Sequence, residues 1–234
     1  STRYNDANFT GSSAGSINVG DKITGLRTFR GQIIVFGVNS LSRLLNITSS
    51  STIAMQDITK NIGCLDGFSI AEIGGDLVFL APDGIRTVAA TARIDDIELS
   101  SISHKILPVI TEIVSNLKDF DLSATVVRTQ NQYRLFYCKA ATGTVSQKGI
   151  IGTFKINPQG IPVWEWSEVQ GIEVVAMSSN FDTDDTEIIH HGDYDGFVHF
   201  HNKGNSFNGS KINAEFKTPD IDYGDIGIRK TLHF

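Results

Sequence analysis

The chain has 234 residues, 40% of them hydrophobic, which is enough for one substantial core or two modest ones. Its 26 acidic and 20 basic residues give a formal net charge of −6, and no Lys/Arg cluster supplies the basic footprint of a tight nucleic-acid binder. A surface that DNA only slides past is compatible with this charge. No apolar run approaches the roughly 20 residues that cross a bilayer, so we expect no membrane-spanning segment.

Residues 1–19 are small and polar, and we expect a polar arm or linker there. Gly11-Ser-Ser-Ala-Gly15 formally matches the G-x-S-x-G nucleophile elbow. That motif needs an apolar strand before the serine and a helix after it, and neither pattern is present. The sequence therefore favours a loop and indicates no catalytic serine.

An internal repeat begins at residue 26. Segments 26–36 and 70–80 both have the pattern of a strand, a turn containing glycine and a strongly apolar strand. Each is followed by another strand, and the equivalent residues Leu41 and Ile85 lie 44 positions apart. Repeats of this length are typical of propeller blades, in which each unit is one antiparallel meander.

Two looser copies follow. Segment 127–137 repeats the pattern, but its partner strand at 150–156 comes only after a longer polar connection. Segment 187–200 restores the short turn with Asp195-Gly196. Asp-Gly between alternating hydrophobic residues is a strong hairpin signal, because both residues tolerate positive φ.

The predicted fold is mainly β: a β-propeller-like array of about four antiparallel meander blades over residues 20–210. One short helix is expected near 108–117, between the second and third units. The alternative is an ordinary all-β sandwich whose hairpins are similar by coincidence. Residues 211–218 alternate as a half-exposed strand does, and we expect 211–234 to lead to a further domain of a longer polypeptide.

Trp164 and Trp166 are two positions apart and should face the same side of a strand. Packing between blades is favoured, and a subunit interface or a carbohydrate-binding platform are the alternatives. A glycosidase or carbohydrate-binding propeller would use these tryptophans with paired carboxylates such as Asp182 and Glu187. Cys64 and Cys138 lack CxxC spacing and are predicted to be buried, unbridged residues.

Four histidines lie in the last unit: His190, His191, His199 and His201. If residues 193–196 form the hairpin loop, His190 lies opposite His199. Two facing imidazoles would need a further ligand to hold a metal. An ordinary blade surface is favoured, and a pH-sensitive contact is an alternative.

The acidic stretch 182–187 suggests calcium, but the later ligands of an EF-hand loop are missing, so solvated turns are favoured. No Walker loop, dinucleotide glycine fingerprint or H-E-x-x-H motif occurs. We therefore predict no catalytic, cofactor-binding or metal-binding residues, no cofactor and no enzymatic activity.

Three stretches resemble the phage tail nozzle family, also called tail tubular protein B, and the related packaged-DNA stabilisation proteins of short-tailed phages. They are Gly20-Asp-Lys-Ile-Thr-Gly-Leu-Arg-Thr-Phe29, then Ile34-Val-Phe-Gly37, and then Ile73-Gly-Gly-Asp-Leu-Val-Phe-Leu-Ala-Pro-Asp-Gly-Ile-Arg-Thr-Val88. Segments 163–167 and 216–230 fit the same pattern.

This resemblance implies a structural protein of the virion tail that is not an enzyme. It implies a self-associating ring, usually of six subunits, that contacts the portal or adaptor and the tail fibres or distal tail. Double-stranded DNA would pass non-specifically through the ring during ejection. The family offers no catalytic residues to transfer onto this sequence.

Overall fold

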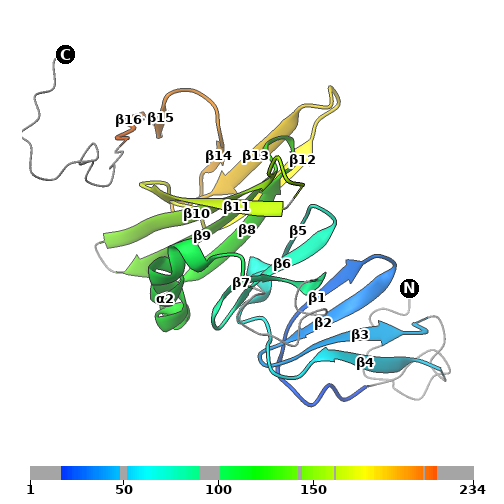
Figure 1. Ribbon diagram of the computed structural model, residues 1–234. Helices are drawn as coiled ribbons and strands as arrows, with labels where there is room; N and C mark the ends of the chain where they lie inside the picture. Colours follow the sequence, from blue (N-terminus) through cyan, green and yellow to red (C-terminus); the bar gives the residue numbers. More distant parts are fainter. Residues whose placement is uncertain are drawn as a thin grey trace, which may run out of the picture. The chain divides into compact units, whose positions relative to one another are not determined.

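The computed structural model describes residues 17–47, 52–89, 101–141, 144–160, 162–207 and 209–214. These residues form four antiparallel sheets of three or four strands, one α-helix and a small hairpin. Each sheet is a meander, in which strands that follow one another in the chain are neighbours (Figure 1). The chain divides into two compact units, residues 1–202 and 203–234, and the four meanders belong to the first.

We number the four sheets blade 1 to blade 4 in chain order. Blade 1 comprises β1 (Ile23–Phe29), β2 (Gln32–Gly37), β3 (Leu41–Leu45) and β4 (Ala54–Thr59). Blade 2 comprises β5 (Ala71–Ile73), β6 (Asp76–Ala81) and β7 (Gly84–Thr87). Turns Arg30-Gly31 and Gly74-Gly75 join the first two strands of these blades, and all four residues have positive φ. This conformation explains why glycine recurs at the 44-residue offset.

Blade 3 is the largest sheet, and blade 4 has three strands. Blade 3 comprises β8 (Asp121–Val127), β9 (Gln132–Ala141), β10 (Thr144–Ile156) and β11 (Pro162–Gln170). Blade 4 comprises β12 (Ala176–Phe181), β13 (Glu187–Gly192) and β14 (Val198–Phe200). In the second unit, β15 (Ser206–Phe207) and β16 (Ser210–Lys211) form the small hairpin.

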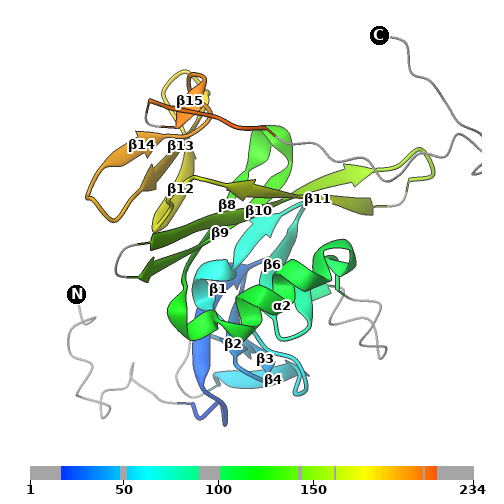
Figure 2. The same cartoon turned by 90° about the vertical axis from the view of Figure 1, so that its left-hand side faces the viewer.

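The predicted fold class is confirmed, since the described residues form four successive antiparallel meanders with one α-helix between blades 2 and 3. The helix, α2, spans Leu107–Ser115, close to the predicted range, with Pro108 in its first turn. It packs beside blade 2 (Figure 2) through Ile110 and Ile113, which are both buried. No helix among the described residues is long and apolar enough to cross a bilayer.

Strand β6 explains how blades 1, 2 and 3 are held together. Its alternate residues Leu77, Phe79 and Ala81 join one buried cluster with blade 1, which we call joint 1–2. Val78 and Leu80 point the other way and join a second cluster with α2 and blade 3, which we call joint 2–3. Because both faces of β6 are buried, its sequence is almost continuously apolar.

Two expectations about strands were wrong. The stretch expected to be a long polar connection before residue 150 is an extended hairpin, because β9 continues to Ala141 and β10 begins at Thr144. In this hairpin Gln147 of β10 pairs with the buried Cys138 of β9. The strand expected over 211–218 is absent over 212–214, where the chain is exposed, and 215–218 lie outside the described residues.

Candidate functional site

The surface between blades 3 and 4, which we call joint 3–4, combines buried polar groups with apolar ones. The alternate residues Tyr133, Leu135 and Tyr137 of β9 face joint 2–3. The residues between them, Arg134, Phe136 and Cys138, lie on the opposite face of β9, toward blade 4. Backbone N–H groups of blade 4 and its linker donate across the joint, from Met177 to Ser123 Oγ (2.9 Å) and from Val174 to Cys138 Sγ (3.2 Å).

Glu187, at the start of β13, links blade 4 to the turn between β8 and β9 through hydrogen bonds. Its carboxylate accepts hydrogen bonds from the backbone N–H of Arg128 (2.8 Å) and Thr129 (2.9 Å), and from the Thr129 hydroxyl (2.6 Å). The Ser179 hydroxyl donates to it as well (2.6 Å). Burial alone would raise the pKa of Glu187, but these hydrogen bonds outweigh it and lower the pKa to about 2.

The predicted pairing of His190 with His199 was wrong by one residue. The loop spans 193–197, because Asp193 N–H donates to Phe197 O (3.1 Å) and Phe197 N–H donates to Asp193 Oδ1 (2.8 Å). Residue Phe197 therefore belongs to the loop, and the register pairs His191 with His199 and His190 with Phe200. His190 lies on the opposite face of blade 4 from His191, with its ring 4.6 Å from that of Phe200.

The other three histidines form a cluster at joint 3–4. The rings of His191 and His199 are stacked with centroids 5.0 Å apart, and His201 meets His191 edge-on at 5.0 Å. His199 Nε2 lies 2.7 Å from Asp193 Oδ2. Among the described residues, no group of three or more His, Cys, Asp or Glu is arranged to hold a metal ion.

The acidic stretch 182–187 is a turn closed by its own side chains. Asp182 Oδ1 accepts hydrogen bonds from the backbone N–H groups of Asp184 and Thr186 (both 2.9 Å). Asp185 has positive φ, which suits the tight turn between β12 and β13. A carboxylate used in this way caps the backbone, as expected of a solvated turn.

Trp164 and Trp166 lie on the same side of β11, as predicted. The indoles are stacked with centroids 5.7 Å apart and pack, half-buried, against the apolar cluster of joint 2–3. Trp166 Nε1–H donates to the carbonyl of Ile102 (2.8 Å). A Cβ on Gly152 would lie only 2.7 Å from the Trp166 ring, so glycine is what lets the indole approach the strand.

These contacts separate the groups that a sugar-binding site would need to bring together. The tryptophans pack into joint 2–3, whereas Glu187 is occupied by Arg128, Thr129 and Ser179 at joint 3–4. Cys64 and Cys138 are both buried and unbridged, as predicted. Gly11-Ser-Ser-Ala-Gly15 lies outside the described residues.

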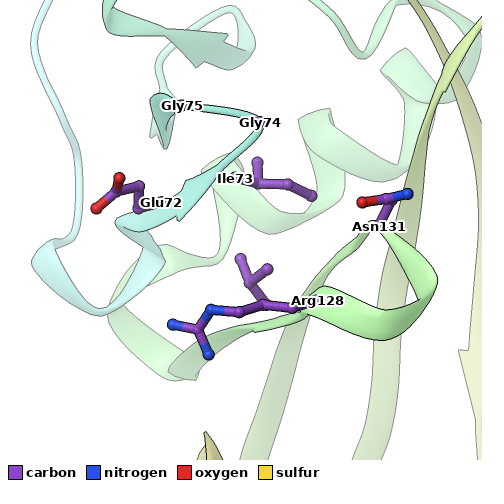
Figure 3. Close-up of a pocket in the computed structure, with 7 residues that line it drawn as sticks. Glu72, Ile73, Gly74, Gly75, Arg128 and Asn131 are labelled. Carbon is purple, nitrogen blue, oxygen red and sulfur yellow. The ribbon is translucent and has the colours of Figure 1, made fainter.

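A polar pocket of about 300 Å³ opens where the β5–β6 turn meets the β8–β9 turn (Figure 3). Glu72 and Arg128 lie on one side of it and Asn131 on the other, with Ile73 between them. The pocket places one acidic and one basic side chain at the same opening. This mixed lining selects no single ligand charge.

Exposed apolar side chains gather on the last strand of blade 4 and the loop before it. Phe197, Val198 and Phe200 are 62%, 73% and 59% exposed. In the four-stranded blades a further strand pairs with the third, but among the described residues blade 4 has no strand paired with the outer edge of β14. Clustered exposed apolar residues commonly mark a protein–protein contact.

Sequence reasoning missed two residues that define joint 3–4. Arg134 is a polar residue in a strand that otherwise alternates toward a core, and it is only 4% exposed. Glu187 was treated as part of an acidic turn. The signal available was its position at the first residue of an apolar strand, where a carboxylate can reach free backbone N–H groups of a neighbouring turn.

No protein-family model and no curated protein matches this chain. Among solved structures, the chain is similar to a crystal structure of the N-terminal domain of Nup159, with 10% sequence identity and a TM-score of 0.35. The match covers 77% of this chain and 60% of that chain, so this chain spans less than two thirds of the Nup159 domain. The sheet topology defines the fold of this chain, independently of this likeness.

Proposed function

We propose that this chain is a structural component of a phage tail, a nozzle or tail-tube subunit that acts through its shape and contacts and not through catalysis. The proposal begins from the resemblance of the strand-and-turn segments of blades 1 and 2 to the tail nozzle family. In the virion tail, such a subunit would form a ring, connect the adaptor to distal tail parts and let the genome pass.

The observation that carries the proposal is the exposed apolar surface at the end of the blade series. Inside the chain, blade faces are covered by the next blade, as the clusters of joints 1–2 and 2–3 illustrate. Phe197, Val198 and Phe200 form the corresponding feature of blade 4 and are exposed. A second copy or an adaptor protein that covers them would bury apolar area without requiring any change in the blades.

The net charge of −6 fits a conduit better than a DNA-binding protein. A channel wall that attracted the phosphate backbone strongly would slow the passage of DNA, because each neutralised phosphate contributes to binding. Near-neutral or weakly acidic walls avoid this retention. Single subunits would therefore bind DNA weakly even at low salt.

The test is to measure the mass of the purified chain alone and after addition of the portal–adaptor complex, by native mass spectrometry. We expect rings, with six copies as the leading stoichiometry, and we expect Phe200→Asp to abolish them. Ile156→Asp is the matched control, since Ile156 is 67% exposed on blade 3. Monomers under all conditions, or rings that survive Phe200→Asp, would overturn the assignment of this surface.

A further inference from the structure

His201 is held at joint 3–4 between two aromatic rings that belong to different blades. Its ring meets Phe136 of β9 at 5.6 Å and His191 of β13 at 5.0 Å, both edge-on. Its Nδ1 lies 3.2 Å from Nδ1 of His191, so one nitrogen donates a proton and the other must accept it. This contact exists only while at least one of the two imidazoles is neutral.

The joint already contains a buried cation. Arg134 is 4% exposed, and its guanidinium donates to the neutral side-chain oxygens of Gln130 (2.8 Å), Gln132 (2.7 Å) and Asn202 (3.2 Å). Neutral acceptors solvate the guanidinium but do not cancel its charge. A proton added to His201 would place a second positive charge beside it.

Charged or titratable side chains face His201 from each of the elements that pack against it. Arg134 lies on β9 and His191 on β13, and the His199–Asp193 pair lies on the hairpin that carries both histidines. Arg134 and His191 both disfavour a charge on His201, whereas Asp193 acts on His191 in the opposite sense. Glu187 acts on Arg134, but its carboxylate is already occupied by four hydrogen bonds.

We propose that joint 3–4 is an acid-sensitive hinge, in which protonation of His201 separates blade 4 from blade 3 while joints 1–2 and 2–3 stay closed. The two blades are linked by residues 171–175, with Gly171 at positive φ. Opening would break the hydrogen bonds that Val174 and Met177 donate to blade 3. It would also expose the thiol of Cys138, which is buried in the closed joint.

The direction of the pH dependence follows from His201. Burial first, and then the charges of Arg134 and His191, lower the pKa of His201 from 6.5 to about 4. A group whose pKa is lower in the closed state stabilises that state above pH 6.5, and the stabilisation is lost as the pH falls toward 4. Allowing for partial solvent exposure, opening should increase on the order of tenfold between about pH 7 and pH 5.

Glu187 can be distinguished from His201 by the pH range in which it is protonated. Glu187 is protonated only as the pH falls from about 4.5 to about 2, below the interval from pH 7 to pH 5 in which the effect of His201 is measured. Asp121 accepts a hydrogen bond from the Tyr194 hydroxyl (2.6 Å), and Glu173 accepts one from the Gln147 side chain (3.1 Å). The variant experiment below separates their contribution from that of His201.

The test compares the two cysteines of the full chain. Cys138 lies at joint 3–4 and Cys64 in the apolar cluster of joint 1–2, so Cys64 is an internal control. Both are labelled with dithiodipyridine between pH 7 and pH 5, and each rate is divided by that of the same thiol in the denatured chain. The ratio of Cys138 to Cys64 labelling should rise on the order of tenfold on acidification.

The His201→Gln variant removes the main titrating group, so the ratio should lose most of its rise even if the substitution loosens the joint at every pH, and what remains reports on His191, whose pKa burial also lowers. The control variant His190→Gln should keep the rise, because His190 lies on the opposite face of blade 4. An equal rise at Cys64 and Cys138 would indicate global unfolding and overturn the proposal. A tenfold rise that persists in His201→Gln would overturn it as well.

Discussion

Joints 2–3 and 3–4 lie on opposite faces of the same strand, β9, and they are built on different principles. The face toward blade 2 places Tyr133, Leu135 and Tyr137 in an apolar cluster in which all three are at most 1% exposed. The face toward blade 4 presents the buried cation of Arg134 beside Phe136 and Cys138, and Cys138 Sγ accepts a hydrogen bond from the Val174 N–H. The carboxylate of Glu187 caps the turn that leads into β9. One strand can thus belong to an apolar core on one side and, on the other, to a contact that also buries a cation.

The difference teaches how stability should be distributed along the chain. An apolar side chain that is fully buried contributes about 1.5–3 kcal/mol by leaving water, whereas a neutral hydrogen bond contributes only about 0.5–1.5 kcal/mol net. Polar contacts instead fix orientation and respond to pH and to competing water. Blades 1 to 3 should therefore unfold together, and blade 4 should open first.

The largest effect is expected from Phe79→Ala in β6. Phe79 is fully buried and meets Phe36 of blade 1 edge-on at 5.5 Å, so its removal leaves a cavity in joint 1–2. The free energy of unfolding should fall by about 3–5 kcal/mol, measured by urea denaturation with tryptophan fluorescence. The matched control is Phe68→Ala, since Phe68 is 72% exposed and should change stability by less than about 0.5 kcal/mol.

A loss below about 1 kcal/mol for Phe79→Ala would contradict the view that β6 holds blades 1 to 3 together. The tryptophans make this measurement specific, because Trp164 and Trp166 report on joint 2–3. If the tryptophan fluorescence shows that joint 2–3 loses stability in parallel with joint 1–2, the two apolar clusters unfold as one unit.

Most of the fold could be predicted from residue types that are compatible with only one kind of local structure. The paired glycines of Gly74-Gly75 and the apolar run of β6 identified the repeat, because positive φ and burial on both faces strongly restrict the residue types. The register of β13 and β14 could not be derived, because the hydrogen bonds between Asp193 and Phe197 lengthen the loop by one residue. The polarity of joint 3–4 depends on which surfaces meet, and local sequence does not encode that.

Glu187→Ala should have the next largest effect, and it should be confined to blade 4. It removes the acceptor of two backbone N–H groups and two hydroxyls, which costs about 1–3 kcal/mol when such donors lose their partner. Protection of the Val174 and Met177 amides in hydrogen exchange should fall, while that of β6 amides should not change. Glu165→Ala is the control, because Glu165 pairs with Lys155 on the exposed side of blade 3.

The same carboxylate predicts a second acid transition. The pKa of Glu187 lies near 2 in the folded protein, so its contribution is complete above its usual value near 4.5 and is lost as the pH falls toward 2. Glu187→Gln should remove this low-pH loss of amide protection at Val174. An unchanged transition in this variant would mean that other carboxylates bring it about.

The smallest effects allow the sharpest comparison, because at each joint one neutral hydrogen bond can be removed by a single substitution. Tyr133 donates its hydroxyl proton to the Ser69 carbonyl (2.8 Å) across joint 2–3, and the Met177 N–H donates to Ser123 Oγ (2.9 Å) across joint 3–4. Tyr133→Phe and Ser123→Ala should each cost about 0.5–1.5 kcal/mol. The first cost should appear in global unfolding, and the second only in amide exchange of blade 4 and in the labelling of Cys138. If Ser123→Ala lowered global stability as much as Tyr133→Phe does, joint 3–4 would be part of the common core and the distinction between the two faces of β9 would fail.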